Sequence, residues 1–316
     1  MHKPILFITL PCFNEEAVLH SSITQLSVLY GDLISDNSIS DQSRLLFVND
    51  GSKDRTWDII QEFVETNPYV CGIKLAKNVG HQNAILAGME SAVQYADVII
   101  TMDADLQDDI DIIPEMLEKY KDGAEIVYGV KKERLVDSRF KRATAKLFYR
   151  LMRVLGVDTI YNHADFRLMS RRAVKALSSY KERNLFLRGI IPQLGYKTDI
   201  IYEDLRPRKA GESKYTLGKM MNLAIDGITS FSIKPIRLVV SLGFVFILIA
   251  ILILIYVLCM VIKGNTVAGW ASLILSMWFI GGCVLVCIGV VGEYVGKIYL
   301  EVKERPRYNI EEVLIK

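Results

Sequence analysis

Hydrophobic and polar positions alternate in blocks of two lengths along the N-terminal part of the chain. Short apolar runs of strand length are separated by longer stretches in which apolar residues recur at helical spacing. The predicted strands are residues 5–10, 44–48, 70–75, the run 98–100 that leads to Asp103, and 125–129; the predicted helices are 15–30, 54–65 and 83–95. Strands that alternate with helices predict an α/β domain with a doubly wound, mainly parallel, Rossmann-like sheet covered on both faces.

The pattern changes in the C-terminal part, where residues 238–262 and 270–292 contain no charged residue. Each run exceeds the about 20 residues that a helix needs to cross a bilayer. Residues 263–269 form a short link, so the two runs predict a transmembrane helical hairpin. The segment 216–237 mixes apolar and polar residues and predicts amphipathic juxtamembrane helices. A buried hairpin of a soluble protein is the alternative for the two runs.

Basic residues flank the predicted hairpin unequally. The flanking residues are Lys234 and Arg237 before the first run and Lys297, Lys303, Arg305 and Arg307 after the second, whereas the link carries only Lys263. The positive-inside rule then predicts that both termini, including a tail of residues 297–316, lie in the cytosol. The start of the chain leads directly into a strand pattern and not into a cleavable apolar region, so we expect no signal peptide.

Composition agrees with this division. The chain has 316 residues, is 51% hydrophobic and has a formal net charge of +2, a length that suggests roughly two domains. Its five cysteines show no paired spacing of the kind that binds metals. We therefore predict neither a disulfide nor a zinc site.

Polar residues cluster where the predicted strands end. Residues 11–16 read Pro-Cys-Phe-Asn-Glu-Glu, residues 49–54 read Asn-Asp-Gly-Ser-Lys-Asp, and residues 77–80 read Lys-Asn-Val-Gly. Each cluster alone is compatible with ordinary turn and helix-cap chemistry. Because the carboxyl ends of parallel strands meet at one edge of a sheet, the clusters together predict a ligand crevice there.

The most informative cluster follows the fourth strand, where residues 101–109 read Thr-Met-Asp-Ala-Asp-Leu-Gln-Asp-Asp. Asp103, Asp105 and Gln107 supply hard oxygen donors of the type that Mg²⁺ or Mn²⁺ selects. A metal held there would neutralise a diphosphate and make it a better leaving group. An acidic solvated turn is the alternative.

These clusters resemble those of the GT-A-fold, family 2 glycosyltransferases. Within that family the resemblance is to polyprenyl-phosphate glycosyltransferases of the dolichyl-phosphate mannose synthase and bactoprenol glucosyltransferase type. It rests on residues 11–16, 49–52, 103–107 (Asp-Ala-Asp-Leu-Gln), 165–168 (Asp-Phe-Arg-Leu) and 206–215 (Arg-Pro-Arg-Lys-Ala-Gly-Glu-Ser-Lys-Tyr). It implies a cytosolic GT-A domain over residues 1–215 and an enzyme integral to the bacterial cytoplasmic membrane.

The resemblance also implies roles for single residues. Pro11, Glu16 and Asp50 would line the nucleoside pocket, and Asp103 would help to bind the nucleotide and the metal. Asp105 and Gln107 would hold the metal beside the diphosphate. The remaining implied residues are the proposed catalytic carboxylate Asp165 and, in a loop near the phosphates, Arg208, Ser213 and Lys214. Many relatives have two acids where this chain has Asn49-Asp50, so only Asp50 is predicted to act there.

The chemistry of a lipid monophosphate acceptor bears on Asp165. A phosphate monoester has its second pKa near about 6, so its oxygen is largely anionic at neutral pH and needs little help from a base. Asp165 could orient the substrates, accept a residual proton, or only pair with Arg167. Cations must offset the repulsion between acceptor and donor. We expect them in residues 206–214 and in the basic amphipathic stretch 139–153, which includes Arg142 and otherwise reads as a solvated surface helix.

The predicted activity is inverting transfer of a hexose to undecaprenyl phosphate, with Mg²⁺ or Mn²⁺ as cofactor. The expected donor is UDP-glucose, and the sequence leaves galactose, N-acetylglucosamine, mannose and modified arabinose donors open, since similar enzymes use all of them. The predicted partners are a UDP-sugar, the polyprenyl phosphate and membrane lipid, and no nucleic acid. Small residues in the second run, at Gly281, Gly282, Gly289, Gly292 and Gly296, favour a homo-oligomer or close packing within the hairpin. The alternatives are a non-catalytic nucleotide-sugar-binding scaffold or flippase partner, and a polysaccharide synthase, whose Gln-x-x-Arg-Trp motif is missing.

Overall fold

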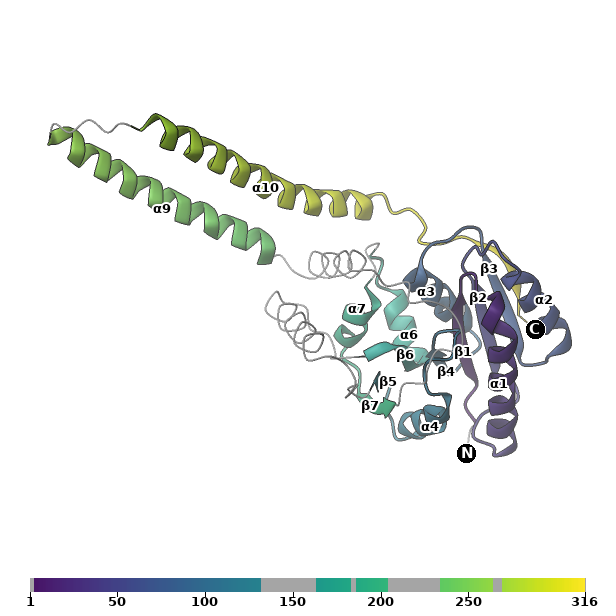
Figure 1. Cartoon of the computed structure of the whole chain (residues 1–316). Coiled ribbons are helices and arrows are strands. Elements are labelled where there is room, and N and C mark those ends of the chain that lie inside the picture. Colours follow the sequence, from purple (N-terminus) through teal and green to yellow (C-terminus); the bar gives the residue numbers. More distant parts are fainter. Residues whose placement is uncertain (1–2, 132–162, 183–185, 204–233, 264–268, 316) are drawn as a thin grey trace. The chain divides into compact units, whose positions relative to one another are not determined.

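The computed structural model describes residues 3–131, 163–182, 186–203, 234–263 and 269–315 (Figure 1). The predicted residues Arg142, Arg208, Ser213 and Lys214, together with most of the juxtamembrane segment, lie outside these ranges. The chain divides into two compact units, one made of residues 1–149, 158–216 and 305–316 and the other of residues 150–157 and 217–304.

The first unit is built on an eight-stranded sheet of order β7-β5-β6-β4-β1-β2-β3-β8. Its strands are β1 Leu6–Cys12, β2 Arg44–Asn49, β3 Val70–Leu75, β4 Val98–Thr101, β5 Ile126–Lys131, β6 His163–Ser170, β7 Thr198–Glu203 and β8 Ile310–Leu314. The pairs β1–β2, β1–β4, β2–β3 and β5–β7 are parallel. The pairs β4–β6, β5–β6 and β3–β8 are antiparallel. The sheet is therefore more mixed than the mainly parallel sheet that the sequence predicts.

Helices cover both faces of this sheet (Figure 1). They are α1 Glu16–Ser35, α2 Thr56–Thr66, α3 His81–Ala92, the 3₁₀ turn η1 Ile110–Ile112, α4 Ile113–Lys121, α6 Arg171–Ser178 and α7 Leu187–Gln193. Every residue of β1 is buried, as expected for a strand covered on both sides. On one face, Leu10 shares a buried core with Leu19 and Ile23 of α1. On the other, Gly88 lets α3 lie against β1, because a Cβ there would be 3.1 Å from Thr9 Cβ.

The first strand is longer than the sequence predicts, because it includes Pro11 instead of ending before it. Proline cannot donate a hydrogen bond and is normally excluded from central strands. Here the carbonyl of Thr9 accepts from Met102 on the β4 side, whereas that of Cys12 accepts from Asp50 on the β2 side. Alternation places the nitrogen of Pro11 on the β4 side, where pairing with β4 has ended at Thr9. No ladder hydrogen bond is lost there.

The C-terminal tail forms a strand that the sequence analysis does not predict. Strand β8 pairs antiparallel with β3, with Val313 opposite Ile73 (Figure 1). Glu312 accepts hydrogen bonds from Trp57 Nε1 at 3.2 Å and from Gln61 Nε2 at 3.3 Å, both on α2. Residues 305–316 therefore belong to the N-terminal unit although the second unit precedes them in the chain.

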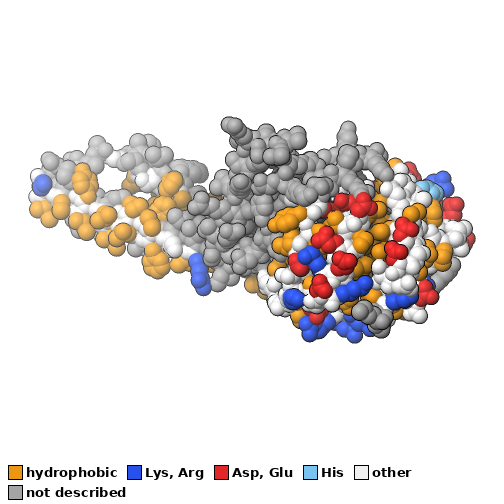
Figure 2. All heavy atoms as spheres, turned by 90° about the horizontal axis from the view of Figure 1, so that it is seen from below, with side chains coloured by type: hydrophobic (Ala, Val, Ile, Leu, Met, Phe, Trp, Pro, Cys, Tyr) orange, Lys and Arg blue, Asp and Glu red, His pale blue; other side chains and the backbone are white. Residues whose placement is uncertain are grey.

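The second unit contains two long helices, α9 Lys234–Ile262 and α10 Trp270–Val302. They contact each other, with the rings of Phe246 and Phe279 6.0 Å apart. Apolar side chains on them face outward (Figure 2). Among the described residues, one stretch, Phe279–Val302, is long and apolar enough to cross a membrane, with a mean hydropathy of 1.9. One such helix is thus present by length and composition, and the two-helix hairpin stays a prediction.

Candidate active site

The loops at the carboxyl ends of β1 and β2 are joined by hydrogen bonds. The backbone nitrogen of Asn14 donates to Ser52 Oγ at 3.0 Å, and that of Lys53 donates to Asn14 Oδ1 at 2.9 Å. The exposed carboxylate of Glu16, at the start of α1, accepts from the backbone nitrogen of Arg55 at 3.0 Å. Pro11 lies buried in β1 just before these contacts. The predicted nucleoside residues Pro11 and Glu16 thus lie at the same edge of the sheet.

Asp50 extends this connection to the loop after β3. Its two carboxylate oxygens accept from the backbone nitrogens of Val79 at 2.7 Å and Gly80 at 3.0 Å. Burial raises the pKa of Asp50, and these two hydrogen bonds partly oppose the rise. The neighbouring Gly51 has a φ of +62°, and a Cβ there would lie 2.5 Å from the backbone nitrogen of Asn78. Asp50 therefore holds the 77–80 loop against β2, whatever else it binds.

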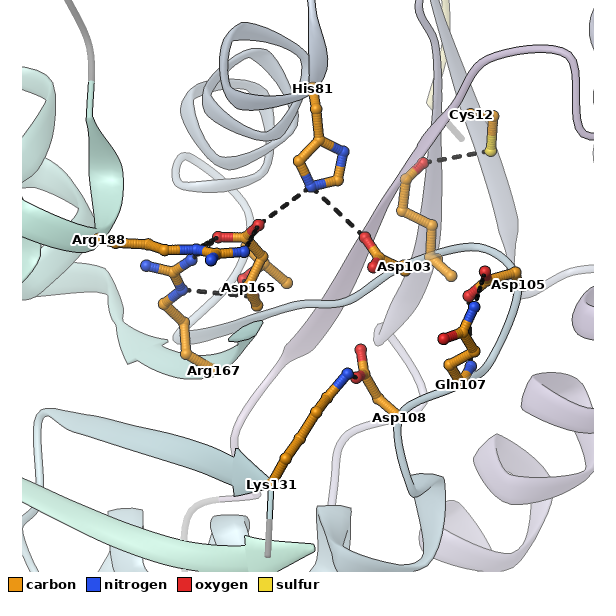
Figure 3. Close-up of polar contacts among 12 residues, drawn as sticks. Cys12, His81, Asp103, Asp105, Gln107, Asp108, Lys131, Asp165, Arg167 and Arg188 are labelled. Carbon is orange, nitrogen blue, oxygen red and sulfur yellow. Dashed lines mark hydrogen bonds and ion pairs between the residues drawn. The ribbon is translucent and has the colours of Figure 1, made fainter. Parts of the chain in front are cut away.

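The segment 103–109, which we call the acidic turn, follows β4. Leu106 has a φ of +49°, in the left-handed region that non-glycine residues seldom adopt. The carboxylate of Asp105 accepts from Gln107 Nε2 at 2.6 Å and from the Gln107 backbone nitrogen at 3.3 Å. Asp103 instead faces His81, whose Nε2 lies 3.5 Å from Asp103 Oδ1 (Figure 3). Within the acidic turn, Asp105 and Gln107 therefore contact each other, whereas Asp103 contacts His81.

Of the three predicted metal ligands, Asp103 faces His81, whereas Asp105 and Gln107 hydrogen-bond to each other (Figure 3). Within the described parts of the chain, no group of three or more His, Cys, Asp or Glu side chains is arranged to hold a metal ion. The donor chemistry nevertheless fits a divalent cation, because carboxylate and amide oxygens are hard ligands. Burial raises the pKa of Asp103 to about 6, with Asp108, Asp165 and Asp105 adding to the rise and His81 opposing it. A cation placed here would relieve that crowding of negative charge.

Asp165, on β6, lies beside the acidic turn and is the centre of an arginine cluster made of Asp165, Arg167 and Arg188. Arg167 pairs with Asp165 Oδ1, and Arg188 Nη2 lies 3.0 Å from Asp165 Oδ2 (Figure 3). His81 Nε2 lies 3.2 Å from the same oxygen, Oδ2. The main chain of Asp165 is held as well, because Thr101 Oγ1 of β4 donates to its carbonyl oxygen.

The charges around Asp165 decide its protonation state. Burial alone would raise the pKa of Asp165, but Arg188, the hydrogen bond from His81, and Arg167 outweigh it and hold that pKa well below its usual range. Burial would likewise lower the pKa of His81, but Asp165 and Asp103 raise it. Asp165 is therefore a carboxylate at neutral pH that is already paired with cations. The pairing with Arg167 raised in the sequence analysis is present, and a second arginine joins it.

A second ion pair fixes the end of the acidic turn. Lys131 Nζ, at the end of β5, lies 3.1 Å from the buried Asp108 Oδ1. Glu203, at the end of β7, accepts from the backbone nitrogen of Asp109 at 2.9 Å. Burial, with the added effect of Asp108, raises the pKa of Glu203 to about 7. These contacts join the acidic turn to the ends of β5 and β7.

Sequence reasoning missed His81, Arg188, Lys131 and Glu203. None of them belongs to a short motif that carries chemistry. The signal that was available for His81 is its place directly after the 77–80 cluster at a strand end. Arg188 stands as an isolated charge in the mostly apolar stretch 186–191, and such a residue reads equally well as a surface position. Only the packing of α3 and α7 brings both to Asp165.

The first unit is a mixed α/β domain of the GT-A-like type, with carboxylates and arginines gathered at the carboxyl ends of its central parallel strands. The chain belongs to the family described as "Glycosyl transferase family 2", whose model matches residues 7–178. This confirms the family resemblance found in the sequence.

Two relatives match along almost their whole length. An "Uncharacterized glycosyltransferase YkoT" of Bacillus subtilis (strain 168) is 50% identical over 98% of this chain and 92% of that protein. A "Prophage bactoprenol glucosyl transferase homolog" of Escherichia coli (strain K12) is 38% identical over 97% of this chain and 98% of that protein. Among solved structures, glucosyl-3-phosphoglycerate synthase from Mycobacterium tuberculosis in complex with Mn²⁺, UDP and phosphoglyceric acid is 16% identical, with a TM-score of 0.46, over 72% of this chain and 76% of that one.

Proposed function

We propose that this protein transfers glucose from UDP-glucose to undecaprenyl phosphate and inverts the configuration at the anomeric carbon. The family supports glycosyl transfer, and the relatives named bactoprenol glucosyl transferase support a polyprenyl phosphate as the acceptor. The observation that carries the proposal is the placement of an acidic turn and an arginine cluster on either side of His81 (Figure 3). Such a site offers carboxylates for a metal and cations for an anionic acceptor.

On this proposal, Asp103, Asp105 and Gln107 hold a Mg²⁺ or Mn²⁺ ion in the acidic turn. The ion would neutralise charge on the diphosphate as it leaves. Lys131 and Glu203 act on this half indirectly, because they hold Asp108 and Asp109 in place. The nucleoside would lie by Pro11, Glu16 and Asp50, whose loops are joined to one another.

The reaction itself asks little of a base. An oxygen of the acceptor phosphate forms a bond to the anomeric carbon, and the bond from that carbon to the diphosphate oxygen breaks, so that UDP leaves with the electron pair. The attacking phosphate is already largely anionic at neutral pH. Asp165, paired with Arg167 and Arg188, therefore serves to hold these cations in place.

The acceptor and the membrane define the remaining parts of the proposal. Arg142, Arg208, Ser213 and Lys214 are proposed to contact the phosphates. Helices α9 and α10 are proposed to cross the cytoplasmic membrane with the catalytic domain on the cytosolic side, and α10 contains the qualifying apolar stretch. A homo-oligomer is proposed on the small residues of α10.

The test is product formation from a panel of labelled nucleotide sugars with undecaprenyl phosphate and Mn²⁺, with and without chelator. The variant is Asp105→Ala, and its matched control is Asp32→Ala, which removes an exposed aspartate of α1. A labelled, chloroform-soluble product from UDP-glucose, lost with chelator and in Asp105→Ala alone, would support the proposal. If another nucleotide sugar were the only donor used, the proposed reaction would stand with that sugar in place of glucose. No lipid product from any donor, with UDP still bound, would favour the scaffold or flippase-partner alternative.

A further inference from the structure

Two arginines, Arg167 and Arg188, pair with the single carboxylate of Asp165. Arg167 is fully buried and its pairing with Asp165, whose side chain is 9% exposed, is enough to balance that carboxylate. Arg188 adds a second guanidinium to the same group and is 33% exposed. The two guanidinium groups repel each other, as the lowering of the Arg167 pKa by burial and by Arg188 indicates. The Arg188 guanidinium therefore lies at a partly exposed position, beside a carboxylate that Arg167 already pairs with, and a cation so placed is suited to bind an anion.

The packing of α7 fixes where that cation lies. The backbone nitrogen of Leu187 donates to Gln82 Oε1 at 2.8 Å, and Gln82 follows His81 at the start of α3. The guanidinium of Arg188 contacts both carboxylate oxygens of Asp165, through Nη2 at 3.0 Å and Nε at 3.4 Å. Asp165 therefore holds the Arg188 side chain and Gln82 holds the backbone of the preceding Leu187, so the position of the cation is prepared before any ligand arrives.

The charged groups nearest to this cation separate it from the metal half of the site. Figure 3 shows Arg188 on the far side of Asp165 from Asp103, with His81 between the two carboxylates. A metal in the acidic turn would serve the leaving diphosphate, so Arg188 is left to serve the other phosphate of the reaction. A guanidinium suits this task because it can form two parallel hydrogen bonds to a phosphate.

We propose that Arg188 binds the phosphate monoester of the acceptor, and that Asp165 and Gln82 are positioning residues that hold Arg188 in place. This inference rests on the proposed function, because it names the acceptor's phosphate as the anion. In this role Asp165 orients Arg188 and accepts no proton from the acceptor. The donor's diphosphate is the other anion that could bind there, and the experiment separates the two.

The experiment measures ligand binding to the full chain in detergent micelles by calorimetry. The probes are farnesyl phosphate, a short prenyl phosphate; farnesol, which lacks the phosphate; and UDP with Mn²⁺. The variants are Arg188→Gln and Arg188→Lys. The matched control is Arg172→Gln, which removes the same charge from an arginine that is 65% exposed on α6 and pairs with Glu125.

We expect Arg188→Gln to weaken farnesyl phosphate binding at least tenfold, the size typical of a lost charge-assisted contact. UDP binding should change less than twofold, and Arg172→Gln should bind both ligands as the wild type does. Arg188→Lys keeps the charge but loses the fork geometry, so a smaller loss of about threefold is expected. Arg188→Lys also provides the test if Arg188→Gln does not fold. In the transfer reaction the same variants should raise the KM for undecaprenyl phosphate and leave the KM for the donor unchanged.

Three results would overturn the inference. An unchanged affinity for farnesyl phosphate and an unchanged acceptor KM in Arg188→Gln would show that Arg188 does not meet the acceptor. Loss of UDP binding in parallel would assign Arg188 to the donor, and equal binding of farnesol would remove the phosphate from the interaction. A wild-type protein that binds farnesyl phosphate through Arg188 but transfers no sugar would instead contradict the proposed function and leave this inference standing.

Discussion

The acidic turn and the arginine cluster contribute to one site but are held by contacts of different range. Asp105 and Gln107, which hydrogen-bond in the turn, are two residues apart in the sequence. In the cluster, Arg188 lies 23 residues from Asp165, and His81, which contacts the same carboxylate, lies 84 residues from it. A site built in this way can lose one half by a local change and the other by a change in the packing of distant elements.

The largest expected effect is on the acidic turn. Asp105→Ala, or removal of the metal by chelator, should lower the rate of sugar transfer about a thousandfold, because charge on the leaving diphosphate is no longer neutralised. The melting temperature should stay close to that of the wild type, since Asp105 is only partly buried and its carboxylate hydrogen-bonds to Gln107, two residues away. The measurement is initial rate against Mn²⁺ concentration. A variant that keeps full activity in chelator would remove the metal from the mechanism.

The next effect is on the arginine cluster and differs in kind. Asp165→Asn leaves Arg167 buried without its counter-charge, so we expect a loss of about 3 kcal/mol in the free energy of unfolding. The acceptor KM should rise about tenfold as Arg188 loses its anchor, and the pH profile of kcat should keep its shape. The control is Asp199→Asn, which breaks a surface ion pair with Lys119 and should do little. Recovery of kcat at high pH in Asp165→Asn would indicate a base and contradict the anchoring role.

Glu203 offers a smaller, pH-dependent effect. Its pKa in the folded protein is about 7, above the about 4.3 of an unfolded chain. The folded state therefore binds more protons between these values, and stability falls as pH rises through about 7. Glu203→Gln should remove this fall and gain about 1–2 kcal/mol at pH 8 with little change at pH 5. The measurement is the melting temperature of both proteins at the two pH values. An equal change in melting temperature between pH 5 and pH 8 in both proteins would show that Glu203 does not titrate in this range.

The smallest effect lies outside both halves of the site, at β8. Glu312→Ala removes the acceptor for Trp57 and Gln61 and should cost about 1 kcal/mol in stability, the usual size for such contacts. Glu311→Ala, whose partner Lys74 is more exposed, should cost less. Neither change should alter the KM for donor or acceptor. A change in acceptor KM would mean that the tail acts on the site and not only on the edge of the sheet.

Several strands were predictable because their residues carry the periodicity themselves. Val70–Leu75 coincides with the predicted strand, and the other N-terminal strands differ by a few residues at their ends. Strands β6, β7 and β8 were not predicted. β8 is short, has acidic residues at positions 311 and 312, and is stabilised by Trp57 and Lys74 from far earlier in the chain. No local pattern can indicate a strand whose partners lie so far away.

The sequence by itself determined the α/β class, the family and the acidic turn, because each depends on residues that are close together in the chain. The tertiary structure decided which cations face Asp165 and that Asp50 supports the loop of Val79 and Gly80. It also decided that the tail returns to the sheet beside β3. These outcomes depend on which helices pack against which strands. Contacts between residues that are distant in sequence form only after that packing, and their charges then set the pKa values on which the chemistry depends.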